Sequence, residues 1–276
     1  MTILTPAKQA VHSLFNLAGL EVHKKRPPEP AALPPRDTMT GALNHLWKLG
    51  LRPRTVIDAG VATQTNDLYQ RFKESKFLLI EPLAEFELFL KRICSTYDAQ
   101  YILAAAGEVD GTVVFNVHPD GFGSSLLHEV EGGSVDGTPR EVPMVTIDSA
   151  CEKRNLAGPY VIKLDVQGAE LQVLAGARRV LRETEAVILE VSLFGAMIGG
   201  PQFCDVISRM KELGFVVYDI SGLVYRPLDG ALSQLDMVFV QENGRFRASH
   251  AWATPEQRKE LLKVHQAFIQ QEHARR

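Results

Sequence analysis

The chain has 276 residues, of which 45% are hydrophobic, and this composition suits one large globular domain with an appendage or two small domains. A formal net charge of -3 and a pI near 6.3 argue against a dedicated nucleic-acid binder, which needs a basic surface to displace phosphate counterions. The sequence has neither an apolar run of the roughly 18 residues that cross a bilayer nor a secretory signal pattern at its start, so we expect a cytoplasmic protein without a transmembrane segment.

The first 50 residues differ in pattern from the rest of the chain. An apolar segment at residues 11–18 is followed at residues 23–36 by five of the 15 prolines. Proline lacks a backbone N–H donor, so this stretch is typical of a linker or an extended arm. Residues 39–51 have the pattern of a short amphipathic helix that ends at Gly50. We expect residues 1–50 to form a helical and proline-rich arm, which suits a lid or the arm of a homodimer.

From residue 51 onward, short apolar strands alternate with amphipathic helices. The expected core strands lie at residues 55–60, 76–82, 99–107, 160–166 and 186–192, and the helices at 66–73, 84–97, 169–183 and 202–214. Continuous apolar strands that alternate with helices indicate a parallel sheet covered on both faces. The pattern therefore predicts an α/β domain over residues 51–245.

Three further segments complete the predicted domain. Residues 111–119 look like an inserted strand, and residues 120–141 like a loop after it. A helix then begins with Asp148 or Ser149 as its N-cap. The last two strands, at residues 215–220 and 235–241, are close enough in sequence to form a hairpin. Beyond them, residues 246–276 are expected to form a polar helical tail.

Carboxylates gather at the predicted strand ends. Four of the five core strands end in or near an acid, at Asp58, Glu81, Asp165 and Glu190. In open parallel sheets, ligands bind outside the carboxyl ends of the strands. Buried strand ends are costly places for acids unless something binds them. This pattern favours a ligand site over a purely structural sheet.

The stretch "TVIDAGVATQT" resembles the turn that holds an adenosine cofactor, and Asp58 discriminates between cofactors. An acid before the first glycine would repel the pyrophosphate of a dinucleotide. It would attract the sulfonium and ammonium groups of S-adenosylmethionine, with a Coulomb energy of about 4 kcal/mol at 4 Å. Glu81, about 20 residues on, is placed to accept the ribose hydroxyls of either cofactor. The turn therefore favours S-adenosylmethionine and disfavours a nicotinamide oxidoreductase.

Ala62 and Gln64 stand where this turn usually has further glycines. Gly60 remains where the strand must turn sharply. Ala62 adds only a methyl group, which the turn tolerates if its φ is negative. Gln64 is the larger anomaly, and we expect it at the start of the following helix with an unstrained backbone. If Gln64 lies there, we expect the turn to bind its cofactor.

Several segments together resemble the FkbM family of S-adenosylmethionine-dependent methyltransferases. The strongest match is "IKLDVQGAELQVLAGA", which is similar to the family's Lys-x-Asp-x-Glu/Gln-Gly-x-Glu signature followed by Leu-x-Gly-Ala. The resemblance covers about residues 51–241. It implies a Rossmann-like class I methyltransferase fold, with a mostly parallel seven-stranded sheet and an antiparallel last strand. It also implies methyl transfer to a hydroxyl of a sugar, glycolipid or natural-product acceptor.

The resemblance also implies roles for individual residues. The cofactor would be held by Asp58, Gly60, Val61, Glu81 and Pro82, with Ala105 and Ala106 near its adenine. Asp165 would face the methyl group and take the proton of the acceptor hydroxyl. Gln167 is uncharged where many relatives carry Glu, which leaves Asp165 as the better base. Candidate substrate contacts are Ser124, Ser125, Gln167 and Glu190.

Alternatives remain open for several of these residues. Asp165 also suits a cofactor-side or structural role, and Glu190 either faces substrate or closes its strand. Glu170 opens a helix, where its charge would complement the helix dipole. Ser124 and Ser125, with His118 and His128 nearby, also suit an ordinary loop. For the chain as a whole, the alternative is a catalytically degenerate relative that serves as a binding or scaffold protein.

The sequence predicts neither disulfides nor a required metal. Cys94, Cys151 and Cys204 are far apart and suit buried, reduced thiols. The histidines, cysteines and acids show no metal-ligand spacing.

Overall fold

The computed structural model describes residues 36–133 and 135–274. Within it, residues 36–248 form one compact unit, and the helix α9 (Pro255–His273) belongs to a separate unit. The expected apolar segment at residues 11–18 and most of the proline-rich stretch lie outside the described residues.

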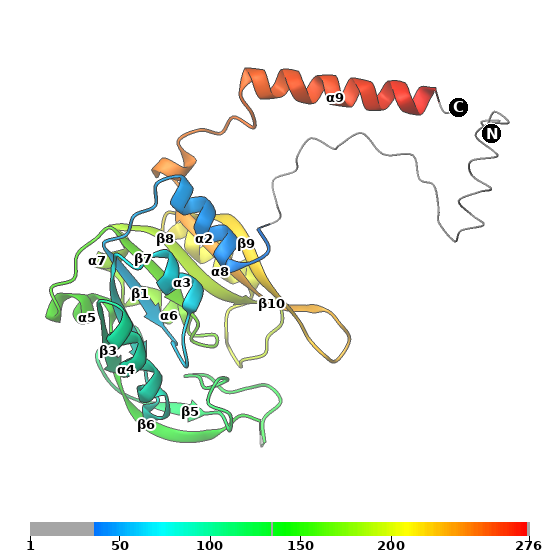
Figure 1. Ribbon diagram of the computed structural model, residues 1–276. Coiled ribbons are helices and arrows are strands. Elements are labelled where there is room, and N and C mark those ends of the chain that lie inside the picture. Colours follow the sequence, from blue (N-terminus) through cyan, green and yellow to red (C-terminus); the bar gives the residue numbers. More distant parts are fainter. Residues whose placement is uncertain (1–35, 134, 275–276) are drawn as a thin grey trace, which may run out of the picture. The chain divides into compact units, whose positions relative to one another are not determined.

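A seven-stranded sheet forms the centre of the compact unit, in the order β3-β2-β1-β7-β8-β10-β9 (Figure 1). The strands β10 (Leu232–Gln241) and β9 (Phe215–Tyr225) form the predicted hairpin, and β10 runs antiparallel to its other neighbour, β8. The predicted mostly parallel, seven-stranded Rossmann-like sheet with an antiparallel last strand is therefore confirmed. The parallel strands are β1 (Thr55–Ala59), β2 (Lys76–Glu81), β3 (Ala99–Leu103), β7 (Tyr160–Leu164) and β8 (Thr184–Ser192).

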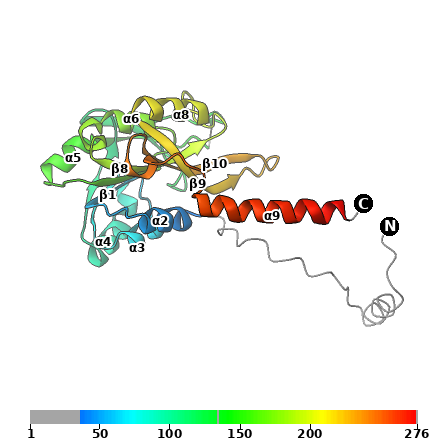
Figure 2. The ribbon, with the colours of Figure 1, turned by 90° about the horizontal axis from the view of Figure 1, so that it is seen from above.

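Helices cover both faces of this sheet (Figure 2). Successive strand side chains point to opposite faces, so Val56 and Ile57 enter two different apolar clusters. The cluster around Val56 includes side chains of α2 (Met39–Lys48), α3 (Asn66–Arg71) and α4 (Glu87–Thr96). The cluster around Ile57 includes side chains of α5 (Ile147–Lys153), α6 (Glu170–Ala175), α7 (Arg178–Leu181) and α8 (Phe203–Glu212).

The helix α2 packs against the core, although the sequence assigns it to the N-terminal arm. Thr38 caps the helix by accepting a hydrogen bond from Gly41 N. Ala42, Leu43 and Leu46 are buried in the same cluster as Val56. This packing makes α2 part of the compact unit.

A second, three-stranded sheet supports the loop that covers the site. It has the order β4-β6-β5, from β4 (Ala105–Ala106), β6 (Thr138–Val145) and β5 (Gly111–Val117). The prediction of a loop through residue 141 was wrong, because residues 138–141 pair with β5. These residues are polar and include Pro139, so they lack the apolar pattern of a strand. Their exposed side chains explain this composition.

Two predicted helix boundaries were also wrong. Thr146 caps α5 through its hydroxyl, whereas Asp148 accepts hydrogen bonds from the first turn of α7. The predicted helix at residues 169–183 is divided into α6 and α7 at Gly176. A Cβ at Gly176 would collide with the carbonyl oxygen of Gly107, so this close approach requires glycine.

The helix α9 begins with a capping box between Thr254 and Gln257 and has no buried residue. Across the helices that the structure describes, none is both long and apolar enough to cross a membrane. Cys151 is buried as expected, but Cys94 is only partly buried and Cys204 is exposed. The expectation of burial was therefore wrong for Cys204, which lies on the outer face of α8.

Candidate active site

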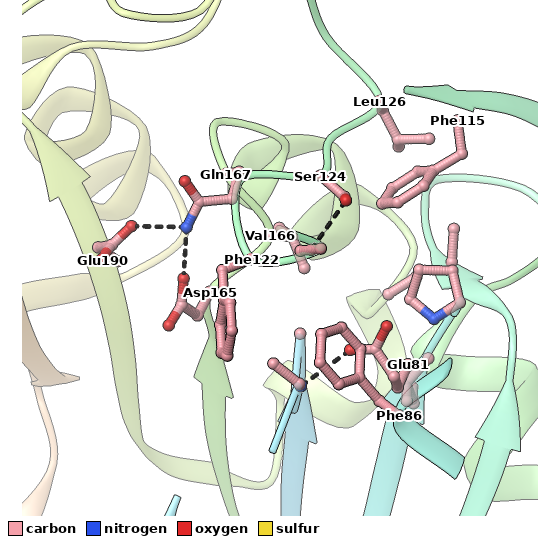
Figure 3. Close-up of a pocket in the computed structure, with 17 residues that line it drawn as sticks. Glu81, Phe86, Phe115, Phe122, Ser124, Leu126, Asp165, Val166, Gln167 and Glu190 are labelled. Atoms are coloured by element: carbon pink, nitrogen blue, oxygen red, sulfur yellow. Dashed lines mark hydrogen bonds between the residues drawn. The ribbon is translucent and has the colours of Figure 1, made fainter. Parts of the chain in front are cut away.

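A cavity of about 260 Å³ lies at the carboxyl ends of β1, β2 and β7, where the sequence predicts the ligand site (Figure 3). Most of the predicted site residues line it: Gly60, Glu81, Pro82, Ala105, Ala106, Ser124, Asp165, Gln167 and Glu190. Asp58, Val61 and Ser125 do not line it. Its further lining residues are Ala62, Ile80, Phe86, Phe115, Gly121, Phe122, Leu126 and Val166.

Glu81 joins the turn after β1 to the end of β2. Its side chain is buried, and Oε2 accepts a hydrogen bond from Ala62 N at 2.9 Å. Oε1 accepts another from Leu83 N, also at 2.9 Å. Burial raises the pKa of Glu81, and these two backbone donors partly offset the rise. Each carboxylate oxygen keeps a lone pair for a ligand hydroxyl.

The turn after β1 is tight, and its strained residue is Ala62. Gly60 has φ 79°, and a Cβ there would collide with the carbonyl oxygen of Asp165. Ala62 has φ 46°, so the negative φ on which tolerance of its methyl group depended is not met. Gln64 is exposed, lies just before the Thr65 N-cap of α3, and is not among the residues with positive φ. The unstrained backbone expected at Gln64 is thus confirmed.

Asp58 is fully buried against α3 and β7. Its Oδ2 accepts a hydrogen bond from the Tyr69 hydroxyl at 2.5 Å. Its Oδ1 has no hydrogen-bond partner among the described residues and lies 3.8 Å from Nζ of Lys163. Burial raises the pKa of Asp58, while Lys163 and Tyr69 lower it. Since Asp58 does not line the cavity, its contact with a cofactor stays a prediction.

Lys163 is a buried cation between two acids. It pairs with Asp58 across the β1–β7 register, and its Nζ lies 3.0 Å from Oδ2 of Asp165. Burial opposes the charge of Lys163, but Asp165 and Asp58 together raise its pKa. The lysine therefore stays protonated and holds one oxygen of Asp165.

Gln167 holds the other oxygen of Asp165. Its side-chain Nε2 donates to Asp165 Oδ1 at 2.9 Å and to Glu190 Oε2 at 3.1 Å (Figure 3). Gln234 donates a second hydrogen bond to the same oxygen of Glu190 at 3.0 Å. Burial, followed by the charge of Asp165, raises the pKa of Glu190 to about 8.

Ser125 fixes the backbone that presents Gln167. Gln167 has φ 53°, which is unfavourable for a side chain of this length. The buried Ser125 hydroxyl donates to the carbonyl oxygen of Gln167 at 2.7 Å. The neighbouring Ser124 lines the cavity, but its hydroxyl is bonded to His118 N and Gly121 O. The inserted loop is thus attached directly to the residues after β7.

The sequence gives no indication of the aromatic wall. The ring centroids of Phe86 and Phe122 lie 5.5 Å apart, although Phe86 is the N-cap residue of α4 and Phe122 belongs to the inserted loop. Phe115 and Leu126 extend this wall (Figure 3). The helical spacing of Phe86 indicated only a core position, so the sequence contained no local signal for this role.

Glu170 holds the backbone that follows β7 at the edge of the site. Its buried Oε1 accepts hydrogen bonds from Val166 N and Gly168 N, both at 3.1 Å. Burial raises the pKa of Glu170 to about 7.

The loop histidines lie outside the cavity. His118 pairs with Asp120, and His128 pairs with Asp136, each at 2.6 Å. Over residues 36–133 and 135–274, no three histidines, cysteines or acids are placed to hold a metal.

Comparison with known protein families gives one match. Residues 58–217 match the model of the family described as "Methyltransferase FkbM domain". No curated protein matches the sequence.

Two solved structures illustrate the likeness. The 1,6-didemethyltoxoflavin-N1-methyltransferase of Burkholderia thailandensis shares 12% identity, with 87% of this chain and 92% of that one covered and a TM-score of 0.40. The magnesium protoporphyrin IX methyltransferase of Synechocystis PCC 6803 shares 10% identity, with 87% and 100% covered and a TM-score of 0.40.

Proposed function

This chain belongs to the FkbM family of S-adenosylmethionine-dependent methyltransferases, and we propose that it methylates a hydroxyl oxygen of a sugar, glycolipid or natural-product acceptor. The observation that carries the proposal is the position of Asp165. Its side chain is 31% exposed and lines the cavity next to the tight turn at Gly60. A carboxylate there is within reach of both a cofactor and an acceptor.

The residues of the cavity fit S-adenosylmethionine. Glu81 offers free lone pairs for the ribose hydroxyls, and Gly60 leaves no side chain in the turn. Ala105, Ala106 and Phe115 provide an apolar surface for the adenine ring. When bound, the cofactor supplies an electrophilic methyl group on a sulfonium centre.

Asp165 is the proposed general base. One of its oxygens is held by Lys163 and the other by Gln167, so the carboxylate is fixed in the cavity. Each oxygen retains a lone pair that accepts a proton from the acceptor hydroxyl. A fixed base also orients the acceptor oxygen, and methyl transfer depends strongly on such alignment.

Glu190 is a poorer base under physiological conditions. Its pKa of about 8 leaves it mostly protonated at neutral pH. A protonated carboxyl donates a hydrogen bond and is suited to orient a second hydroxyl of the acceptor. This division of roles supports Asp165 as the proton acceptor.

The test is a transfer assay with methyl-labelled S-adenosylmethionine and a panel of neutral sugars, glycolipids and polyketides. We expect the label in a product that survives mild alkali, because an ether resists the hydrolysis that releases a methyl ester. Label on nitrogen, on carbon or in an alkali-labile ester would contradict methylation of a hydroxyl. Calorimetric titration with S-adenosylhomocysteine and NAD tests the cofactor separately, and only the first should bind.

A further inference from the structure

A second, smaller cavity of about 30 Å³ adjoins the first through Gln167 and Glu190. Its other side is formed by the loop between β8 and α8, including Ala196 and Met197, and by Gln234 of β10. If the proposed function holds, the acceptor approaches Asp165 along this side, because Glu81 and the turn at Gly60 occupy the cofactor side.

The same loop carries part of a group of exposed apolar side chains, which we call the apolar rim. The rim comes from the β8–α8 loop and from the end of the β9–β10 hairpin, that is, residues 223–225 of β9 and the turn after them, which projects beyond the sheet (Figures 1 and 2). These two segments are joined, since Leu193 N donates to Ser233 O at 2.8 Å and the Arg226 guanidinium lies 3.9 Å from the Phe194 ring centroid. The rim consists of Phe194, Ile198, Leu223, Val224, Tyr225 and Leu228, with exposures from 37% to 83%.

The apolar rim carries almost no charge of its own. Residues 193–201 have no charged side chain, and residues 223–233 have only Arg226 and Asp229, which pair at 2.6 Å. A group of exposed apolar side chains whose single cation is paired with an acid suits a neutral apolar ligand. It does not suit nucleic acid or an anionic membrane, which require unpaired lysines or arginines.

The two cavities also lack the cations that an anionic head group requires. Neither cavity is lined by a lysine, arginine or histidine. The nearby cation, Lys163, is 6% exposed and is already bonded to Asp165. A phosphate or carboxylate beside the reacting hydroxyl would face Asp165 without a compensating charge. The amide and carboxyl side chains that line the cavities can instead exchange hydrogen bonds with neutral hydroxyls.

We propose that the acceptor is a neutral amphiphile, whose hydroxylated head lies at Asp165 and Gln167 while its apolar part lies on the apolar rim. The inference rests on the proposed function and narrows its substrate class. We assign the rim to the acceptor because the β8–α8 loop supplies Met197 to the second cavity and Phe194 and Ile198 to the rim.

The test uses three probes on protein saturated with S-adenosylhomocysteine: methyl β-glucoside, octyl β-glucoside below its micellar concentration, and octyl phosphate. Each buried methylene strengthens binding by roughly fourfold, so burial of two gives octyl β-glucoside more than tenfold higher affinity than the methyl compound. Octyl phosphate should bind more weakly than octyl β-glucoside. Equal affinities for the two glucosides, or tighter binding of the phosphate, would overturn the proposal.

Two variants locate the binding surface. Leu228→Ser, at the most exposed rim position, should remove much of the octyl advantage, and Leu88→Ser on α4 is the matched exposed control. An equal effect of both variants would contradict the assignment.

Other outcomes would overturn the proposal in distinguishable ways. Binding of phosphatidylcholine vesicles without binding of monomeric octyl β-glucoside would indicate a membrane surface instead. A dimer that Leu228→Ser converts to a monomer would assign the rim to a second copy. Failure to bind S-adenosylhomocysteine in the same titrations would count against the proposed function itself.

Discussion

The side-chain amide of Gln167 donates hydrogen bonds to both Asp165 and Glu190, at 2.9 and 3.1 Å. One amide group therefore bridges the carboxylate of Asp165 and the carboxyl group of Glu190. Ser125 of the inserted loop holds the backbone of Gln167 in the left-handed region. The orientation of the proposed base thus depends on a loop residue that lies 42 positions earlier in the chain than Gln167.

Removal of that loop contact should impair catalysis more than binding. Ser125→Ala deletes the hydrogen bond to Gln167 O and the one that the hydroxyl accepts from Leu127 N, and we expect it to lower the free energy of unfolding by about 1–3 kcal/mol. Turnover should fall while the affinity for S-adenosylhomocysteine stays nearly constant, because Ser125 does not line the cavity. Urea denaturation measures the stability, the methyl-transfer assay the turnover, and calorimetry the affinity. Ser95→Ala, on the exposed face of α4, is the control, and an equal result for both variants would contradict the role of Ser125.

The buried cation should contribute strongly to stability. Lys163→Met leaves the carboxylate of Asp58 buried without a counter-charge, so we expect a loss of about 3–5 kcal/mol. The exposed Lys76→Met should change the free energy of unfolding by less than about 0.5 kcal/mol. Adding Asp58→Asn to Lys163→Met should recover part of the loss. Additive losses in the double variant would show that the two side chains do not interact.

The turn after β1 offers a pair of opposite substitutions. Gly60→Ala places a methyl group against the carbonyl oxygen of Asp165 at positive φ, and should cost about 2–5 kcal/mol. Ala62→Gly relieves a left-handed backbone and should raise stability by up to about 1 kcal/mol. Thermal unfolding of the two variants compares them directly. A stable Gly60→Ala protein with unchanged cofactor affinity would refute the geometry of this turn.

Glu190 should make stability depend on pH. Its pKa is raised from 4.5 to about 8, so the folded state holds the proton more tightly than the unfolded chain. Its contribution is fully present below pH 4.5 and is lost as the pH rises towards 8. Glu170 and Asp236, with pKa values raised to about 7 and 6, add to the decline.

Urea denaturation from pH 4.5 to 8.5 isolates the effect of Glu190. The decline should be less steep for Glu190→Gln than for the wild type, and unchanged for the exposed Glu74→Gln. Parallel pH profiles for the wild type and Glu190→Gln would show that Glu190 titrates normally.

The sheet and the place of the site could be predicted from sequence because both depend on local patterns. Apolar runs define the strands, and parallel strands bring their carboxyl ends to one edge, which gathers Glu81, Asp165 and Glu190 around one cavity. The alternation of strands and helices likewise predicted the two covered faces.

The features that the sequence did not predict depend on contacts between distant segments. The pairing of Asp58 with Lys163 follows from the register of β1 against β7, which no local pattern contains. The aromatic wall joins Phe86 to Phe122 across two elements. Similarly, the positive φ of Ala62 is set by the turn that Glu81 holds, and alanine gives no sign of it.

The most direct test of the account is the effect of Asp165→Asn on methyl transfer to an acceptor that the wild type methylates. Asparagine keeps the size of the side chain but accepts no proton, so turnover should fall by about 10²–10⁴-fold. Affinity for S-adenosylhomocysteine should change by less than about threefold, because the base acts in the transition state. Unchanged turnover, or an equal loss of turnover and affinity, would contradict the role of Asp165 as the base.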